Sequence, residues 1–239
     1  LYLLWGPYLL SANARQVALR FLTISYRNSP MLLFLLTLLG VTFWLVRKPV
    51  GALARAGEAF FTALTVGLAL SLILRALQVD SANLLPVWVE DLPAVGSATL
   101  PVLGLVGYVV FAACLGEYVT PEQNGQRRAL LWGVGLCLML TALQVVCLGN
   151  FGPGLVVRMD TPFFMMVKGI GFEGTFQRVE SVMIALWVLA DLALLALLAC
   201  ACSTLAQKTF ALHRRRTAVL PVILAGAAGA AWVFPGAFA

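Results

Sequence analysis

The sequence is poor in charge. Asp, Glu, Lys and Arg make up 11% of its 239 residues, against about 25% in an ordinary soluble domain. Hydrophobic residues make up 62%, and the mean hydropathy is +0.96. This composition excludes a soluble globular domain. The apolar runs are long and continuous rather than alternating, which also excludes a transmembrane β-barrel. We therefore predict an all-α polytopic membrane protein.

The sequence also lacks the residues of an active site. It contains one histidine and no HExxH, GxSxG or Walker motif, and no carboxylates stand at catalytic spacing. The five cysteines lie in apolar segments without zinc-like spacing, so we interpret them as small hydrophobic residues. We expect no enzyme, metal or cofactor. The net charge of +6 requires no nucleic-acid partner, because basic loops beside a lipid membrane explain it.

Apolar segments predict seven helices in one transmembrane domain covering residues 1–239. Their approximate bounds are 1–20, 31–46, 59–77, 93–118, 129–148, 179–204 and 217–234. Segment 149–175 is too polar and too rich in glycine and proline to span, so we predict an interfacial or re-entrant piece. The last helix is rich in small residues, which suits tight packing against another helix. Because the chain begins in apolar sequence without methionine, we expect truncation at one end or both.

The loops predict the orientation. Lys and Arg are concentrated in loops 47–55, 120–128 and 208–216, which share one side if the helices alternate. The opposite loops are more mixed and carry acidic residues, including Glu90 and Asp91. The positive-inside rule makes the basic loops cytoplasmic.

The predicted helix 93–118 contains many helix breakers in its first half. They are Gly96, Ser97, Thr99, Pro101, Gly104 and Gly107. Proline removes a backbone donor and glycine relaxes the backbone, so freed polar groups need a partner inside the bilayer. One interpretation is a transporter-like substrate site. The other is close helix packing through small residues, with one ordinary kink. Both remain open from the sequence.

Asp191 lies in the middle of the sixth predicted helix, one turn after Trp187. A charge there costs about 2.5–3.5 kcal/mol, so we expect it to face the bundle interior. It is either a site for a cation, a proton or a substrate amine, or a carboxyl that is neutral or hydrogen-bonded to a neighbouring helix. Glu58 is expected to begin the third helix, where the helix dipole favours it. Arg178 and Glu180 open the sixth helix and are expected to form a structural ion pair.

A series of short motifs resembles one family. In chain order they are Leu53 to Glu58, Asn83-Leu84-Leu85-Pro86-Val87, Gly152-Pro153, Thr161-Pro162-Phe163-Phe164, Val167-Lys168-Gly169-Ile170, Phe176-Gln177-Arg178-Val179-Glu180 and Trp187. The chain thereby resembles the B subunit of bacterial spore germinant receptors, along nearly its whole length. It departs from the family pattern at Gln177 and Glu180, and at Tyr108, where the family often has glutamate.

The resemblance implies a fold similar to permeases of the amino acid–polyamine–organocation superfamily. That fold is a LeuT-like bundle of ten helices in two inverted five-helix repeats, of which this chain would contain the third to the ninth. The interrupted helix becomes helix six, which forms the substrate site with helix one. The candidate ligand-binding residues are Ser97, Thr99, Gly104, Gly107, Tyr108, Asp191 and Tyr8.

The implied function is a nutrient sensor in the inner membrane of a bacterial spore. Its ligand would be a small-molecule germinant, and an amino acid is the class that the resemblance favours. The resemblance also implies two partner subunits, a membrane protein with a large soluble domain and a lipoprotein. One alternative is an amino-acid transporter coupled to H⁺ or Na⁺, because this fold serves both functions. Another is a scaffold subunit without sensing.

Overall fold

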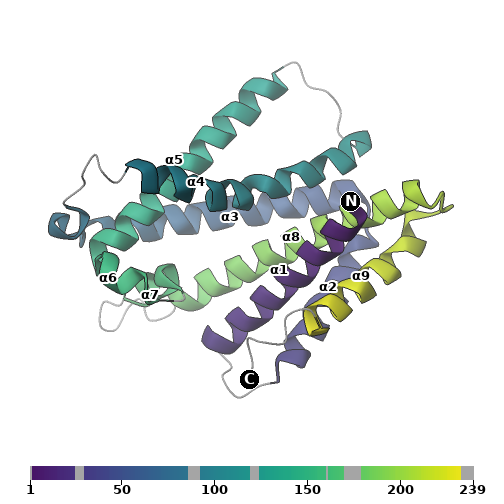
Figure 1. Ribbon diagram of the computed structural model, residues 1–239, viewed down its shortest axis with the longest axis horizontal. Coiled ribbons are helices and arrows are strands. Elements are labelled where there is room, and N and C mark those ends of the chain that lie inside the picture. The colour runs from purple at the N-terminus through teal and green to yellow at the C-terminus, as the bar shows by residue number, and fades with distance from the viewer. Residues whose placement is uncertain are drawn as a thin grey trace. The chain divides into compact units, whose positions relative to one another are not determined.

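The computed structural model describes residues 2–24, 30–85, 92–118, 124–159, 161–169 and 179–232. The elements in these ranges are helices, and the ranges contain no strand, which confirms the predicted all-α class. The long helices are α1 (Tyr2–Ile24), α2 (Met31–Val46), α3 (Val50–Ala76), α4 (Leu92–Val106), α5 (Gly125–Phe151), α8 (Val179–Thr209) and α9 (Arg215–Trp232) (Figure 1). Shorter elements are α6 (Pro153–Val156), α7 (Pro162–Lys168) and the 3₁₀ helices η1 (Ser81–Leu84) and η3 (Gly107–Tyr118).

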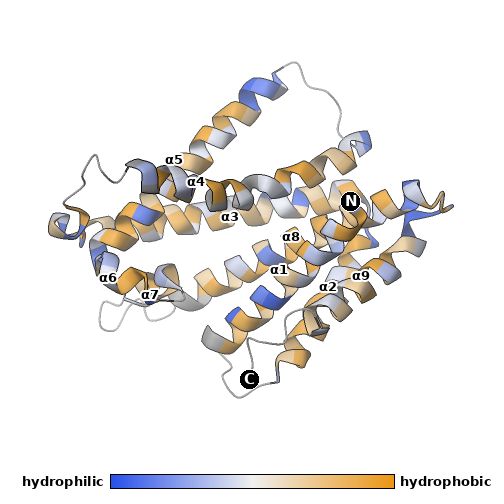
Figure 2. Ribbon diagram, viewed as in Figure 1, coloured by the Kyte–Doolittle hydropathy of each residue, from blue (hydrophilic) through white to orange (hydrophobic). Residues whose placement is uncertain are grey.

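Three helices of the described chain are long and apolar enough to cross a membrane. They are Val50–Ala76, Gly125–Phe151 and Val182–Thr209, and α2 is a shorter apolar helix. Hydrophobic residues cover most of their length, whereas hydrophilic residues gather at several helix ends and within α1 (Figure 2). The pattern of long apolar helices is that of a polytopic membrane protein.

The third helix begins earlier than predicted. It begins at Val50, and the Pro49 carbonyl accepts from the amides of Ala52 at 3.0 Å and Leu53 at 3.3 Å. Residues 52–55, which are alanine, leucine, alanine and arginine, have high helix propensity, so the helix continues through the stretch that we had predicted to be a basic loop. Glu58 therefore lies in the third turn rather than the first, so our interpretation of Glu58 through the helix dipole was wrong.

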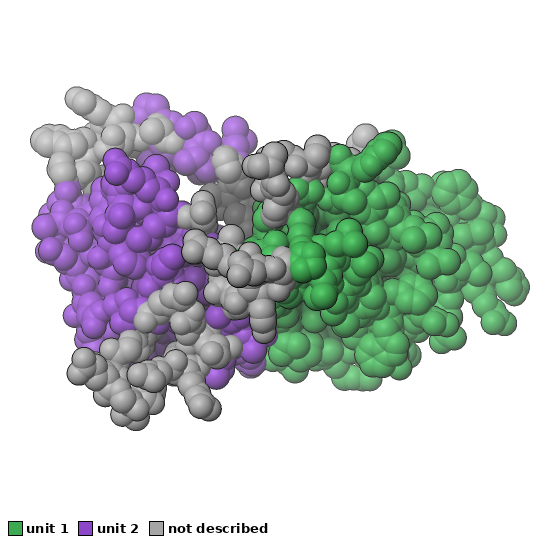
Figure 3. All heavy atoms as spheres, turned by 90° about the horizontal axis from the view of Figure 1, so that it is seen from below, with its two compact units in different colours: residues 1–61, 107–119, 187–239 green, residues 62–106, 120–186 purple. Residues whose placement is uncertain are grey.

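The chain divides into two compact units (Figure 3). Unit 1 comprises residues 1–61, 107–119 and 187–239, and unit 2 comprises residues 62–106 and 120–186. The boundary at 106/107 falls where α4 ends and η3 begins. Each unit has its own contacts and is described by itself.

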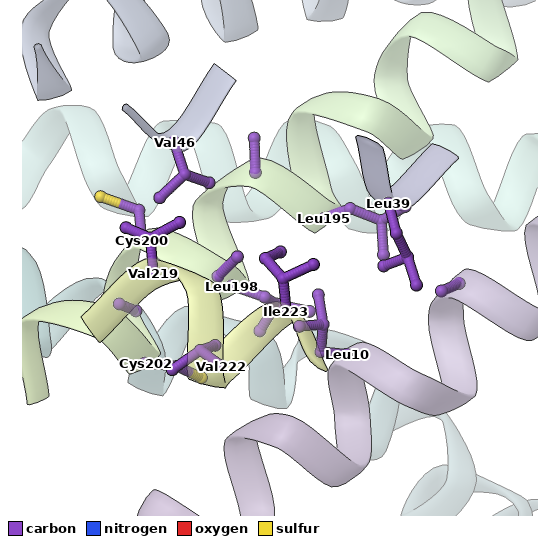
Figure 4. Close-up of a cluster of buried hydrophobic side chains, with 14 of the residues drawn as sticks. Leu10, Leu39, Val46, Leu195, Leu198, Cys200, Cys202, Val219, Val222 and Ile223 are labelled. Atoms are coloured by element: carbon purple, nitrogen blue, oxygen red, sulfur yellow. The ribbon is translucent and has the colours of Figure 1, made fainter. Parts of the chain in front are cut away.

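In unit 1, α9 packs closely on α1, and both contact α2. Side chains of α1, α2, η3, α8 and α9 form the core, including Leu10, Leu39, Leu198 and Val219 (Figure 4). A Cβ at Gly226 of α9 would lie 2.9 Å from Leu10 Cδ2 of α1, and one at Gly229 would lie 2.3 Å from Ser11 Oγ. These glycines let the two backbones approach, which is how membrane helices associate without a hydrophobic driving force between them. The small-residue helix thus packs tightly, and its partner is α1.

Several helix ends meet at one end of unit 1. Lys208, near the end of α8, places Nζ 2.6 Å from Glu117 Oε1, near the end of η3. Arg215, the first residue of α9, donates from Nη2 to the carbonyls of Val46 at 3.1 Å and Lys48 at 3.0 Å. A guanidinium there satisfies carbonyls that the end of α2 leaves without an intrahelical partner. These contacts hold together helix ends adjacent to the three basic loops.

In unit 2, a buried arginine connects α3 to α7. Arg75 is 9% exposed, and its Nε donates to the Met166 carbonyl at 2.7 Å while Nη1 donates to Gln78 Oε1. Asn150 of α5 donates to the Arg75 carbonyl at 3.3 Å. Segment 149–175, which we expected to be interfacial or re-entrant, contains the last residues of α5 and the short helices α6 and α7. Arg75 is the polar anchor of α7.

The Arg75 guanidinium packs against the C-terminal end of α7, where the capping residue is Gly169. A larger residue would collide with it, because a Cβ at Gly169 would lie 1.9 Å from Arg75 Nη2 and 2.9 Å from Cζ. We expect Gly169→Ala to displace the guanidinium and lower the free energy of unfolding by about 1–3 kcal/mol. Gly154→Ala is the matched control, because a Cβ at that position would have no neighbour within 4 Å among the described residues. Thermal unfolding of the purified chain in detergent measures both. Equal midpoints for the two variants would contradict the anchor.

Candidate functional site

The interrupted helix changes type at Gly107. Residues Leu92–Val106 form an α-helix, and Gly107–Tyr118 form a 3₁₀ helix of 12 residues. Runs of 3₁₀ helix longer than about 3–4 residues are uncommon, and a change inside a helix often marks a hinge or strain. The predicted helix is therefore interrupted, but at Gly107 and not throughout its first half as we expected. Proline and glycine weaken a helix without ending it when the neighbouring hydrogen bonds persist.

The glycines of this segment face open space. A Cβ at Gly96, Gly104 or Gly107 would have no neighbour within 4 Å in the described part of the chain, apart from its own helix. Ser97 and Thr99 are exposed, and Thr99 Oγ1 donates back to the Gly96 carbonyl at 2.6 Å. Within the described residues, close helix packing does not account for these glycines, in contrast to those of α9.

The start of η3 is connected to α1 by a polar contact in unit 1. The period of three in a 3₁₀ helix places Tyr108, Phe111 and Cys114 on one face, and all three contact the core of unit 1. The half-buried Tyr108 hydroxyl accepts from Asn13 Nδ2 at 2.8 Å. Asn13 also donates to the Leu9 carbonyl at 2.8 Å. A tyrosine oxygen is thus an uncharged acceptor at the position where the resemblance implied a carboxylate.

Asp191 forms an ion pair with a residue of α1. Its Oδ2 accepts from Arg20 Nη1, and the side chains of Arg20 and Asp191 are 24% and 14% exposed. Arg20 Cζ also lies 5.2 Å from the centroid of the Trp187 ring, which is a cation–π distance. The carboxylate therefore faces a neighbouring helix and has a cation of the chain as partner.

Sequence reasoning missed Asn13 and Arg20. They are seven residues apart on α1, which places them on the same helix face, two turns or about 10 Å along the axis. That spacing of polar residues in an apolar helix was the available signal. The chain also buries Arg15 on α1, whose Nη1 donates to the Ala230 carbonyl of α9 at 2.7 Å.

The remaining candidates lie in different parts of the chain. Tyr8 of α1 is 42% exposed, and its ring is stacked on Trp5 with centroids 5.4 Å apart. Gly107, Tyr108, Asp191 and Tyr8 belong to unit 1, whereas Ser97, Thr99 and Gly104 belong to unit 2. Arg178 lies outside the described residues. Glu180 is in the first turn of α8, and its side chain also lies outside the described set.

Two of the polar contacts between α1 and its neighbours in unit 1 bring together groups that could bind a ligand. Asn13 and Tyr108 supply hydrogen-bond groups, and Arg20 and Asp191 supply both signs of charge beside an aromatic ring. Such a set of groups suits recognition of a small polar molecule. Among the residues that the structure describes, no group of three or more His, Cys, Asp or Glu is placed to hold a metal ion.

The comparisons with known proteins agree with this architecture. A family model described as spore germination protein, a permease family, matches residues 1–230. No curated protein and no solved structure gives a significant match. The family match covers nearly the whole chain, and the apolar helices fit an integral membrane protein. The chain therefore belongs to the permease-like family of spore germination proteins.

Proposed function

We propose that this chain is the ligand-sensing subunit of a nutrient receptor in the inner membrane of a bacterial spore. It binds a small nutrient, an amino acid, and signals germination rather than catalysing a reaction. The observation that carries the proposal is the change from α to 3₁₀ helix at Gly107, with no described atom of another element within 4 Å of a Cβ at Gly104 or Gly107. A switch of this kind needs two conformations that bind the ligand with unequal affinity.

The junction has the properties of a hinge. It falls at the boundary between the two units, and the residue that follows it is tied to α1 by the Asn13–Tyr108 hydrogen bond. Unwinding at Gly107 would free backbone groups that hydrogen-bond a nutrient, as in helices broken near the middle of a membrane. Ser97, Thr99 and Gly104 of unit 2 and Tyr8 of unit 1 stay predictions from the sequence.

We also propose the ten-helix inverted repeat for the complete protein. In that arrangement α1 and α2 would be the third and fourth helices, and α8 and α9 the eighth and ninth. Helices five apart are equivalent in the two repeats, so unit 1 would contain two equivalent pairs. The shared core of α1, α2, α8 and α9 supports this assignment.

The orientation follows from the basic loops. The ion pair of Lys208 with Glu117 and the bonds of Arg215 to Val46 and Lys48 join helix ends next to the predicted loops 47–55, 120–128 and 208–216. The structure shortens these loops, because residues 50–55, 125–128, 208–209 and 215–216 are helical. This arrangement supports one common side for the three loops, which the positive-inside rule makes the cytoplasmic, or core, side. The two partner subunits, one with a large soluble domain and one lipoprotein, would complete the receptor.

Germination of spores tests the proposal. Spores that carry the complete locus as their only receptor are exposed to amino acids, sugars and nucleosides, and release of core contents is followed. We expect an amino acid to trigger release. Gly107→Ala, which favours a regular helix by up to about 1 kcal/mol, should raise the half-maximal dose about fivefold. Gly135→Ala of α5 is the control, because a Cβ there would also meet nothing within 4 Å.

Two outcomes would count against sensing at this junction. If no nutrient acts although the protein is present in the spore membrane, the receptor proposal fails. Uptake of a labelled amino acid into vesicles under an H⁺ or Na⁺ gradient would then identify the transporter alternative. If Gly107→Ala and Gly135→Ala shift the dose equally, the junction is not the switch.

A further inference from the structure

We propose that Arg20, Asp191 and Trp187 form a specificity-determining site that reads both charges of the ligand. The Arg20 guanidinium would take the ligand's carboxylate, and the Asp191 carboxylate would take its ammonium group. This inference rests on the proposed function and assigns residues to it. Nothing in the sequence motifs points to Arg20, which lies 171 positions from Asp191 and meets it only in the folded chain.

The charge balance of the pair carries the argument. Both side chains are largely shielded, at 24% and 14% exposure, so loss of the opposite charge beside either one would be costly. A zwitterion is neutral overall and carries one charge of each sign. It can replace Asp191 on the guanidinium and Arg20 on the carboxylate at the same time, so that both protein charges remain paired. A ligand with a single charge can replace only one of the two partners, and a sugar can replace neither.

The geometry around Trp187 supports the same ligand class. Trp187 precedes Asp191 by one turn of α8, which places the two side chains on the same helix face. Its ring already holds a cation, since Arg20 Cζ lies 5.2 Å from the centroid. A ligand ammonium group that displaces Arg20 from Asp191 would lie beside the Trp187 ring and could make the same kind of cation–π contact. The planar guanidinium matches a carboxylate with two parallel hydrogen bonds, which lysine cannot provide.

The position on α1 connects this site to the helix junction. Arg20 shares its face of α1 with Asn13, whose side chain donates to the Tyr108 hydroxyl at the start of η3. A ligand inserted between Arg20 and Asp191 would separate α1 from α8 locally. Because α1 is a continuous helix over Tyr2–Ile24, that displacement would reach the Asn13–Tyr108 contact.

The test compares three forms of each active amino acid in the germination assay. These are the free amino acid, its carboxamide, which lacks the carboxylate, and its desamino acid, which lacks the ammonium group. We expect wild-type spores to respond to the free amino acid at a dose at least tenfold below either analogue. Arg20→Gln should abolish the preference over the carboxamide, and Asp191→Asn the preference over the desamino acid. Lys208→Gln, at an exposed ion pair, should leave both preferences unchanged.

A merely structural pair gives a different result. In that case each variant shifts the potency of all three compounds by the same factor, and the preferences stay unchanged. That result overturns this inference. The proposed function still stands if the amino acid triggers germination. A wild type that responds to no nutrient overturns both. Where a single variant does not accumulate, the double variant Arg20→Gln/Asp191→Asn, which removes both charges together, replaces it and should lose both preferences. The site is supported if Arg20→Gln loses only the preference over the carboxamide and Asp191→Asn only the preference over the desamino acid. An equal shift in the potency of all three compounds overturns it.

Discussion

Replacing Asp191 by leucine is expected to lower the free energy of unfolding by about 3 kcal/mol. The substitution leaves the Arg20 guanidinium without its carboxylate between α1 and α8. Removal of one partner of a buried ion pair costs about 3–5 kcal/mol, and partial exposure of Arg20 places the effect at the lower end. The measurement is thermal unfolding of the purified chain in detergent, without nutrient, so that ligand recognition does not enter.

The double variant Arg20→Met/Asp191→Leu separates the charge from the packing. An apolar pair of similar volume is often neutral relative to a buried ion pair, so we expect the double variant to recover most of the lost stability. Comparison of both single variants with the double variant gives the coupling energy of the pair. A double variant whose losses simply add would show that the two residues do not stabilise one another.

Replacing Gly229 by leucine is expected to separate α9 from α1 and to lower the free energy of unfolding by about 3 kcal/mol. A Cβ at this position would lie 2.3 Å from Ser11 Oγ and 3.0 Å from Ser11 Cβ, and the second atom cannot rotate away. The helices must therefore move apart and lose the close contact that holds them in the membrane. The loss is read as a lower unfolding midpoint or as less protein in the membrane.

Two variants make this prediction specific. Gly40→Leu of α2 introduces the same side chain where a Cβ has no neighbour within 4 Å, and it should leave the midpoint unchanged. Ser11→Gly removes both clashing atoms, so it should restore part of the stability lost in the milder variant Gly229→Ala. If Gly40→Leu is as harmful as Gly229→Leu, the cause is leucine in a membrane helix and not the contact with α1.

The sequence predicted most of the helices because hydropathy is a local property. Twenty apolar residues in a row need a helix in a membrane whatever the rest of the chain does. Helix ends were harder to predict, because a charged residue was read as a boundary. The α3 helix includes Arg55 and Glu58, and its start depends on Pro49 and on the helix preference of the residues that follow. Small residues in the last helix predicted close packing, but not which helix would be the partner.

The sequence by itself determined that this chain is an all-α membrane protein, and its ordered motifs placed it in the spore germination family. Only the tertiary structure decided where the interrupted helix changes type and which residues meet Asp191. Helix breakers show where a helix is weak, whereas the change at Gly107 coincides with the packing of Tyr108 and Phe111 in unit 1. The partner of Asp191 lies 171 residues away, so no local pattern encodes the pair. It exists because packing brings one face of α1 beside α8.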